Sequence, residues 1–324
     1  MKAILFTRHG GPDVLEYVDV DLSPPVRRQV RVRHTAIGVN FAETSMRAGR
    51  GHYGVSPPSG LGSEAVGIIE AVGDDVAGLE IGERVAYSGG ALCAYAEAAN
   101  VPASALLKLP DGLSDDVIAA SLSKGMTAQY LLKAAFPVQA GQTILFHAAA
   151  GGVGQIATQW AKHLGATVIG SVGSDEKIAF AKEAGCDHVV NTRREGWVAQ
   201  VRELTGGVGV AAVYDSIGKD TFQGSLDCLQ RRGFLVSFGE SSGPIPPLDL
   251  GLLRKGSLYV TKQGMASHAV TPVDVARMSA DLFAVLQAGA VKVHIGQRMK
   301  LADAGELHRA LESRTTIGAS ILIP

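Results

Sequence analysis

Residues 143–157 read TILFHAAAGGVGQIA and combine three structural patterns. The short apolar run at 143–146 is typical of a buried parallel strand. The small residues after it predict a tight turn. A helix is expected next, with an apolar face made of Val153, Ile156, Ala157 and Trp160. Because a second strand is expected at 167–171, this stretch predicts the beginning of a βαβ unit.

The predicted turn suits the pyrophosphate of a dinucleotide. Gly151 and Gly152 carry no side chains, so the backbone can approach the phosphates, and Gly154 lets the helix pack closely on the strand. The free N–H groups at the helix start favour an anion. The G-x-G-x-x-G fingerprint occurs here with Ala149 in the first glycine position. We expect the cofactor to contact Ala150, Gly151, Gly152 and Val153; the alternative is a glycine-rich turn without a ligand.

The composition describes a large folded protein without a charge bias. A chain of 324 residues is too long for one simple core, so two domains are expected. Hydrophobic residues make up 46% and charged residues 19%, which fits a globular protein. A net charge of -1 gives no global basic field for nucleic acid or an anionic membrane. We therefore expect neither a nucleic-acid nor a membrane partner.

The cysteines and the N-terminus indicate the cellular compartment. Cys93, Cys186 and Cys228 are far apart and form no C-x-x-C spacing, and such scarcity favours a reducing environment. The first residues, from Met1 to Arg8, read as the start of a strand rather than as a signal sequence. No apolar run is long enough to span a bilayer. We expect a cytoplasmic protein.

The pattern of predicted secondary structure changes near residue 120 and divides the chain in two. Up to about residue 120, short strand patterns such as 30–37, 64–73 and 81–87 alternate with Gly, Pro and Asp, which predicts a compact β-rich domain. From there to about 260, strands alternate with helices, as in a doubly wound parallel sheet. The predicted fold class is α/β, with a Rossmann sheet and a separate β-rich domain.

Four motifs then occur in order: Gly38–Glu43, Gly60–Gly67, Lys124–Tyr130 and Ala149–Gly154. With these motifs the chain resembles, over its whole length, the zinc-independent quinone oxidoreductases. They are the zeta-crystallin-like branch of the medium-chain dehydrogenase/reductase superfamily. The resemblance implies a GroES-like β-rich catalytic domain at 1–120, a Rossmann NADPH-binding domain at 121–260, and a return at 261–324 that completes the catalytic domain.

A zinc site is not expected. Zinc-dependent relatives have Cys and His where this chain has Asn40 and Ser63, and neutral Asn and Ser cannot replace thiolate and imidazole as ligands. Where such relatives often add a four-cysteine loop, the chain has only Cys93. Glu64 alone is not a site, and we interpret it as a buried acid that braces the fold. Without a Lewis acid to stabilise an alkoxide, reduction of an electrophilic acceptor is favoured over alcohol oxidation.

The end of the second Rossmann strand favours NADPH over NADH. NAD-binding folds place an acid there for the ribose hydroxyls, but this chain has Gly173 and Ser174. Asp175 is expected to start the next helix, with Lys177 in its first turn. In the resembling family, the residues at Ser174 and Lys177 contact the 2′-phosphate. The alternative for Lys177 is a solvated helix residue.

The resemblance implies further cofactor contacts, at Thr127, Thr192, Phe238, Gly239, Ser241 and Arg314. Thr127 belongs to a motif that we expect to start the helix leading into the Rossmann domain. Thr192 replaces a frequent tyrosine, which removes an aromatic face. Phe238 would lie beside the nicotinamide half, although core packing explains it equally well. Arg314 faces either the cofactor or solvent.

Asn40 and Tyr53 are the predicted catalytic residues. By family analogy Asn40 lies near the nicotinamide ribose, where its amide could hydrogen-bond a substrate carbonyl or the cofactor; the alternative is an Asn that closes a turn. Relatives line the substrate pocket with a tyrosine near Tyr53, although the preceding loop differs here. Ser45 stands where they often carry another tyrosine. His52 is interpreted as a solvated loop residue.

The last part of the chain is expected to contain a helix at 278–288, a strand at 291–295, a helix at 304–311 capped by Asp303, and a strand at 319–324. Relatives dimerise by joining Rossmann sheets at an edge strand, and Leu258–Val260 is the candidate for that edge. We therefore expect a homodimer.

The predicted function is that of an NADPH-dependent quinone reductase. The protein would hold donor and acceptor close and aligned for hydride transfer from C4 of NADPH to a quinone. A second hypothesis is an NADPH-dependent enone or enoyl-thioester double-bond reductase. A third, from another class, is a cofactor-binding structural or RNA-binding protein. The pairs Arg193-Arg194 and Arg231-Arg232 are too short to indicate an RNA site.

Overall fold

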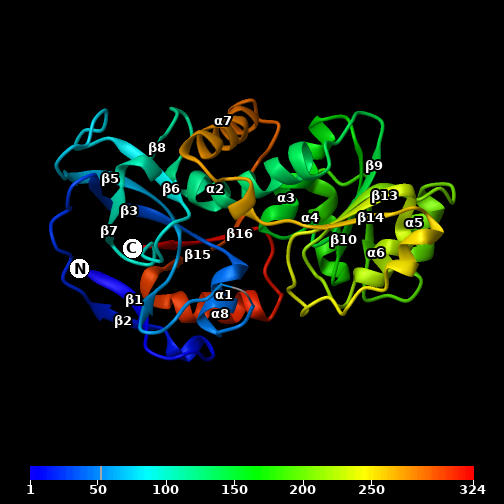
Figure 1. Cartoon of the computed structure of the whole chain (residues 1–324), viewed down its shortest axis with the longest axis horizontal. Helices are drawn as coiled ribbons and strands as arrows, with labels where there is room; N and C mark the ends of the chain where they lie inside the picture. The colour runs from blue at the N-terminus through cyan, green and yellow to red at the C-terminus, as the bar shows by residue number, and fades with distance from the viewer. Residues whose placement is uncertain (52) are drawn as a thin grey trace. The chain divides into compact units, whose positions relative to one another are not determined.

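The computed structural model describes residues 1–51 and 53–324. The chain forms two compact units (Figure 1). A terminal unit is built from both chain ends, Met1–Ser123 and Val293–Pro324, and a central unit comprises Lys124–Lys292. The first division lies close to the expected one near residue 120. The second lies at 293 rather than at 261, so residues 261–292 belong to the central unit.

Helix α7 (Pro272–Gln287) explains why the second division comes late. Asp281 on this helix accepts hydrogen bonds from Gln129 Nε2 at 2.9 Å and from Lys133 Nζ at 2.8 Å. Leu282 is buried against Gly125, where a Cβ atom would lie 2.3 Å from Leu282 Cδ1. These contacts hold α7 in the central unit.

The predicted strand at 291–295 is wrong. Val291 is buried and donates its N–H to the Val285 carbonyl, and Lys292 donates its N–H to Gln159 Oε1 at 2.9 Å. These contacts tie the segment to helices instead of to a sheet. The strand begins later, as β15 (Ile295–Lys300), where exposed and half-buried side chains alternate.

The described residues of the terminal unit form two sheets. The smaller has the order β2-β1-β4 (Glu16–Asp19, Lys2–Phe6 and Ser59–Gly60). The larger has the order β15-β16-β3-β5-β6-β8, and β7 also pairs with β3. Its remaining strands are β3 (Gln29–Val39), β5 (Glu64–Val72), β6 (Arg84–Ser88), β7 (Ala98–Pro102), β8 (Leu107–Lys108) and β16 (Ala319–Ile323). Ile321 of β16 pairs with Gly38 of β3, so the end of the chain completes this sheet.

Helices α1 (Phe41–Arg47), α2 (Asp115–Tyr130) and α8 (Ala304–Glu312) come before or after strands of these sheets along the chain. Helix α1 follows β3, and α8 precedes β16. Asp303 occupies the N-cap of α8 but makes no side-chain capping bond, so that prediction is wrong in its chemistry. Helix α2 begins where Ser114 Oγ accepts the Val117 N–H at 3.3 Å. Thr127 therefore lies in the last turn of α2 and not at a helix start, contrary to the prediction.

The central unit contains one parallel sheet of six strands. Their order is β11-β10-β9-β12-β13-β14, with bounds His188–Asn191, Thr167–Val172, Thr143–Phe146, Val210–Asp215, Leu229–Ser237 and Tyr259–Lys262. Counted along the unit, this order is 3-2-1-4-5-6, which is that of dinucleotide-binding sheets. The strand order reverses between β9 and β12, and β14 forms one edge.

Helices α3 (Gly152–His163), α4 (Ile178–Glu183), α5 (Trp197–Leu204) and α6 (Phe222–Cys228) lie against this sheet (Figure 1). Its core includes the fully buried Leu145, Ile169, Val213 and Leu235. Continuous apolar runs are typical of strands covered on both faces, which is why β9 and β10 could be predicted from the sequence. No helix formed by the described residues is both long and apolar enough to cross a membrane.

Candidate functional site

The glycine turn connects β9 to α3 as predicted. Ala148 adopts a left-handed conformation with φ of 52°, and Gly151 is the N-cap of α3. A Cβ atom on Gly154 would lie 2.2 Å from the Ala148 carbonyl oxygen, so only glycine allows the helix to come this close to the turn. The first helical turn contains no acidic residue. The backbone N–H groups at this end of α3 are therefore suited to an anion.

The end of β10 lacks an acid that could bind a ribose. Gly173 and Ser174 follow the strand, and Ser174 is extended with φ of -158°. Asp175 begins the next helical turn, as expected, where its carboxylate accepts a hydrogen bond from Asn191 Nδ2 at 2.9 Å and forms an ion pair with Arg194. Because Asp175 is held in this way, the position after β10 offers glycine and a hydroxyl rather than a carboxylate.

A second cation at this position was missed by the sequence analysis. A Cβ atom on Gly173 would lie 3.9 Å from Arg193 Nε, and the Arg193 N–H donates to Asn191 Oδ1 at 2.9 Å. Burial and the nearby charge of Arg193 lower the pKa of Lys177. Arg193 is the second residue after β11, and the carboxyl ends of adjacent parallel strands meet at one edge of a sheet. This placement is the pattern that could have identified it.

The loops after β12 and β13 are joined by backbone hydrogen bonds. The Phe238 N–H donates to the Asp215 carbonyl at 2.9 Å, and the Ser241 N–H donates to the Ser216 carbonyl at 3.1 Å. A Cβ atom on Gly239 would lie 3.0 Å from the Ser216 carbonyl oxygen. The Phe238 ring packs on Phe146 with centroids 5.8 Å apart. Phe238, Gly239 and Ser241 thus lie at the carboxyl ends of the strands, and Phe238 also contributes to packing.

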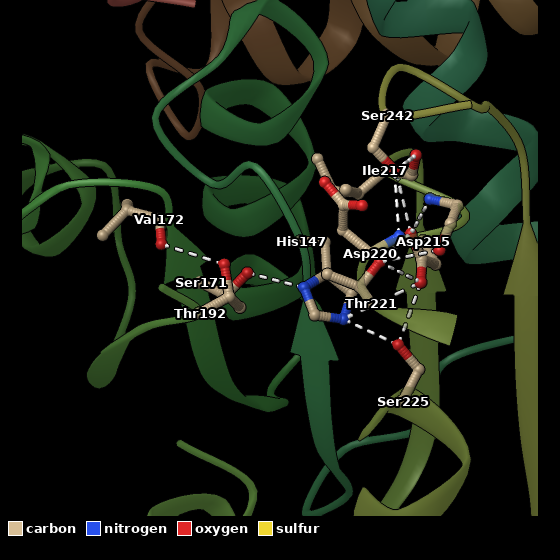
Figure 2. Close-up of polar contacts among 11 residues, drawn as sticks. His147, Ser171, Val172, Thr192, Asp215, Ile217, Asp220, Thr221, Ser225 and Ser242 are labelled. Atoms are coloured by element: carbon tan, nitrogen blue, oxygen red, sulfur yellow. Dashed lines mark hydrogen bonds and ion pairs between the residues drawn. The ribbon is translucent and has the colours of Figure 1, made fainter. Parts of the chain in front are cut away.

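A buried polar chain lies beneath these loops (Figure 2). His147 contacts Ser171 Oγ with Nδ1 and Ser225 Oγ with Nε2, at 2.6 Å and 2.9 Å. Ser225 Oγ also donates to Asp215 Oδ2 at 2.9 Å.

Thr192, the first residue after β11, donates its side-chain hydroxyl to the Val172 carbonyl at 3.3 Å. The hydroxyl that replaces the expected tyrosine is thus bonded to the end of β10.

Asn40 occupies the N-cap of α1 in the terminal unit. Its amide nitrogen donates to Glu64 Oε2 at 3.0 Å, while Glu64 Oε1 accepts the Ser123 N–H at 2.6 Å. Glu64 is fully buried, so its interpretation as a bracing acid is confirmed. Gly38 leaves room for this carboxylate, because a Cβ atom there would lie 2.4 Å from Glu64 Oε2. Among the described residues, no group of three or more His, Cys, Asp or Glu side chains could hold a metal ion.

Comparison with known proteins identifies the family. Residues 26–111 match the alcohol dehydrogenase GroES-like domain, and residues 152–281 match the zinc-binding dehydrogenase family. A quinone oxidoreductase of Pseudomonas aeruginosa is 46% identical over 324 residues, which cover 100% of this chain and 99% of the relative. The chain belongs to the quinone oxidoreductase family. The resemblance expected from the four ordered motifs is therefore confirmed, and so is the combination of Rossmann and GroES-like folds.

A solved structure and a second kind of relative extend this comparison. The quinone oxidoreductase of Escherichia coli, whose structure is a complex with NADPH, matches with a TM-score of 0.95 and 44% identity and covers 100% of both chains. A 2-haloacrylate reductase of Burkholderia sp is 42% identical over 332 residues, covering 100% of this chain and 99% of the relative. The family thus includes proteins named for two kinds of acceptor.

The remaining predicted residues of this family member lie in different parts of the chain. Tyr53 is 39% exposed in the loop after α1, and Arg314 follows α8 in a left-handed conformation with φ of 58°. Both belong to the terminal unit, whereas Thr127 belongs to the central unit. Ser45 lies within α1. His52 lies outside the described residues.

Proposed function

We propose that this chain is an NADPH-dependent quinone reductase that transfers hydride without a metal. The observation that carries the proposal is the carboxyl edge of the central sheet. There Gly154 allows the N-terminus of α3 to approach the glycine turn closely. Lys177 and Arg193 are two cations near Gly173, the position at which NAD-binding folds carry an acid. The quinone oxidoreductase relatives, one of them solved with NADPH, support this choice.

The residues of the central unit fit a phosphorylated dinucleotide. The backbone of Ala150, Gly151, Gly152 and Val153 would receive the pyrophosphate at the start of α3. Ser174, Lys177 and Arg193 would bind the 2′-phosphate through a hydroxyl and two cations, which form stronger hydrogen bonds to phosphate than neutral donors do. Phe238, Gly239, Ser241, Thr127, Thr192 and Arg314 are proposed as further contacts.

Asn40 would polarise the acceptor. Bound NADPH supplies the hydride. One N–H of the Asn40 amide is committed to Glu64, which leaves the other N–H of the same group as a donor for the acceptor oxygen. Tyr53 is proposed to line the acceptor pocket. Reduction of a quinone consumes one hydride and one proton, and we assign the proton to water, since a hydroquinone anion needs little assistance.

The donor types at the zinc position support the metal-independent part of the proposal. Asn40 and Ser63 offer an amide and a hydroxyl in place of thiolate and imidazole. The carboxylate of Glu64 is occupied by Asn40 and by the Ser123 N–H. Acceptor activation would therefore come from a neutral amide, which suits an acceptor that is already electrophilic.

NADPH oxidation with a panel of simple quinones and linear enones, with a metal chelator present, tests the proposal. Turnover of quinones that is insensitive to the chelator is expected. Turnover of enones alone would move the assignment to double-bond reduction. Tight NADPH binding without turnover of either class would favour a cofactor-binding structural or RNA-binding protein, which a gel-shift titration at varied salt would then examine.

Double-bond reduction is the second candidate function, because the 2-haloacrylate reductase relative matches the whole chain at 42% identity. An activated alkene is also an electrophilic acceptor. In this case Asn40 would bind the carbonyl or carboxylate oxygen of the alkene, and the same panel decides between the two.

We also propose a cytoplasmic homodimer. The edge strand β14 leaves one side of the parallel sheet unpaired within the chain, and Tyr259 on this strand is 46% exposed. The three free cysteines fit a reducing compartment. Light scattering of the purified chain would test the dimer, and a monomer would contradict it.

A further inference from the structure

His147 is the first residue after β9, and it is fully buried. Its two ring nitrogens contact hydroxyls from two other elements, Ser171 on β10 and Ser225 on α6 (Figure 2). Trp197 packs edge-on against the imidazole with centroids 5.7 Å apart. A buried polar ring with both nitrogens bonded fixes the positions of its neighbours. The imidazole therefore links the end of β9 to β10 and α6 within the central unit.

Asp215, at the end of β12, terminates this polar chain. It is fully buried and accepts hydrogen bonds from Ser225 Oγ at 2.9 Å and from Thr221 Oγ1 at 2.8 Å. Its Oδ1 atom accepts the N–H groups of Ile217 at 2.7 Å and of Gly218 at 3.0 Å. The carboxylate therefore holds the turn that follows β12.

These contacts determine which atom carries the proton in each hydrogen bond of the polar chain. The single proton of the Ser225 hydroxyl is donated to Asp215, so Ser225 Oγ must accept the N–H of His147 Nε2. Burial lowers the pKa of His147, which keeps the ring neutral. Its Nδ1 then accepts the hydroxyl proton of Ser171. One tautomer, with the proton on Nε2, satisfies every member of the chain.

The two ends of this polar chain, at Ser171 and at the Asp215 turn, contact the loops where the strand order of the sheet reverses. The Ser171 carbonyl accepts the N–H of Ala149 in the glycine turn at 2.9 Å. At the other end, the Ile217 carbonyl accepts the Ser242 hydroxyl at 2.7 Å (Figure 2). Ligands of doubly wound sheets bind at this reversal of strand order, here between β9 and β12. His147 thus couples the glycine turn to the loops after β12 and β13 from beneath.

We propose that His147, as its Nε2–H tautomer, is a positioning residue that sets the affinity for the dinucleotide without touching it. The proposal rests on the proposed function only in taking NADPH as the ligand. Removing the imidazole breaks the link between the glycine turn and the Asp215 turn, so the loops lose their fixed spacing. The effect is expected on cofactor binding, because His147, Ser171 and Asp215 are buried beneath the loops that the cofactor would contact.

His147→Phe and Ser171→Ala test the proposal, with His34→Phe as the matched control. His34 is also buried with both nitrogens bonded, to the Ala96 carbonyl at 2.7 Å and to Tyr87 OH at 2.9 Å, but none of its partners belongs to the central sheet. The dissociation constant for NADPH is measured by nucleotide fluorescence, and the melting temperature is measured alongside. The kcat with a quinone is measured at saturating NADPH.

The dissociation constant is expected to rise about tenfold in His147→Phe and about threefold in Ser171→Ala, the losses that one or two hydrogen bonds imply. The kcat should stay within about twofold. His147→Gln, which restores one acceptor and one donor, should recover most of the affinity. Nitrogen NMR of the wild-type protein, which needs no nucleotide, should show the proton on Nε2.

A purely structural role would give a different result. His147→Phe and His34→Phe would then lose melting temperature alike, and both would bind NADPH as the wild type does, which overturns the proposal. A proton on Nδ1 overturns it as well, and this measurement remains decisive if His147→Phe does not fold. Failure of the wild-type protein to bind NADPH would instead refute the proposed function, because the tautomer is measured without nucleotide.

Discussion

The side-chain amide of Asn40 donates a hydrogen bond of 3.0 Å to Oε2 of the fully buried Glu64. Asn40 Nδ2 is the donor in this bond, so the NH2 group of Asn40, rather than its oxygen, faces Glu64. Glu43 on the first turn of α1 accepts the backbone N–H of Asn40. Both carboxylates thus hold Asn40 in one orientation before any acceptor binds.

Glu64→Gln should therefore weaken catalysis through Asn40. The neutral amide can turn its own NH2 group toward Asn40, so the orientation of the Asn40 amide is no longer fixed. We expect kcat/KM for a quinone to fall about tenfold, which corresponds to about 1.4 kcal/mol. Steady-state kinetics measures this change. Glu70→Gln, at an exposed carboxylate of the same strand, is the control, and equal activity of both variants would contradict the orienting role.

Replacing Arg47 should destabilise the terminal unit far more than replacing Arg50, although both contact the same atom. Glu312 Oε1 lies 2.6 Å from Nη2 of Arg47, which is 1% exposed, and 3.1 Å from Nη2 of Arg50, which is 64% exposed. Arg47 also donates to the Gly10 carbonyl at 3.1 Å. Arg47→Met should lower the free energy of unfolding by about 3–5 kcal/mol. Arg50→Ala should lower it by less than about 1 kcal/mol.

Urea unfolding measures both Arg variants. Similar losses would show that burial does not determine the strength of this ion pair.

The stability should fall as the pH is lowered from about 7.5 to about 5, because His34, His147 and His308 are buried in neutral form. Burial lowers the pKa of His34 to about 4, and burial together with the charge of Arg47 lowers the pKa of His308 to about 3. The unfolded chain protonates near its usual pKa of about 6.5. Below that pH it binds protons that the folded chain does not, so the free energy of unfolding decreases.

The slope approaches about 1.4 kcal/mol per pH unit for each histidine that is buried in neutral form. Urea unfolding at several pH values measures it. The double variant His34→Gln, His308→Gln should reduce the slope and leave the part that His147 contributes, whereas His163→Gln, at an exposed histidine, serves as the control. An unchanged slope in the double variant would be inconsistent with this assignment.

Lys177→Ala and Arg193→Ala should each reduce the preference for NADPH. Lys177 follows β10, and Arg193 follows β11 and lies beside Gly173, where the 2′-phosphate is proposed to bind. A hydrogen bond to a charged group contributes about 1.5–3 kcal/mol, so kcat/KM for NADPH should fall roughly tenfold or more while that for NADH changes little. Lys182→Ala, at an exposed cation of α4, is the control. An equal loss for both nucleotides would place the phosphate elsewhere.

Local patterns made much of the fold predictable. The apolar runs of β9 and β10 and the spacing of Gly151 and Gly154 depend on neighbours in sequence, and the structure confirms them. The prediction of a strand at 291–295 was wrong because the segment hydrogen-bonds to Gln159, which is distant in sequence.

The site was less accessible to sequence reasoning than the fold. Thr127 was placed at a helix start, although the helix that begins after Ser114 continues to Tyr130 and includes it. Arg193 was dismissed as part of a short basic pair, although its position after β11 brings it beside Gly173. The partner of Asn40 comes from another strand, β5, and only the folded sheet brings the two together.

The most direct test of the central claim is a single turnover of the chelator-treated protein with NADPH carrying deuterium at C4 and a simple quinone. Direct hydride transfer predicts one hydroquinone formed per NADPH oxidised, and a primary isotope effect on the rate from one face of the nicotinamide only. An absence of NADPH oxidation, or turnover that appears only after a divalent metal is added, would contradict metal-independent hydride transfer to a quinone.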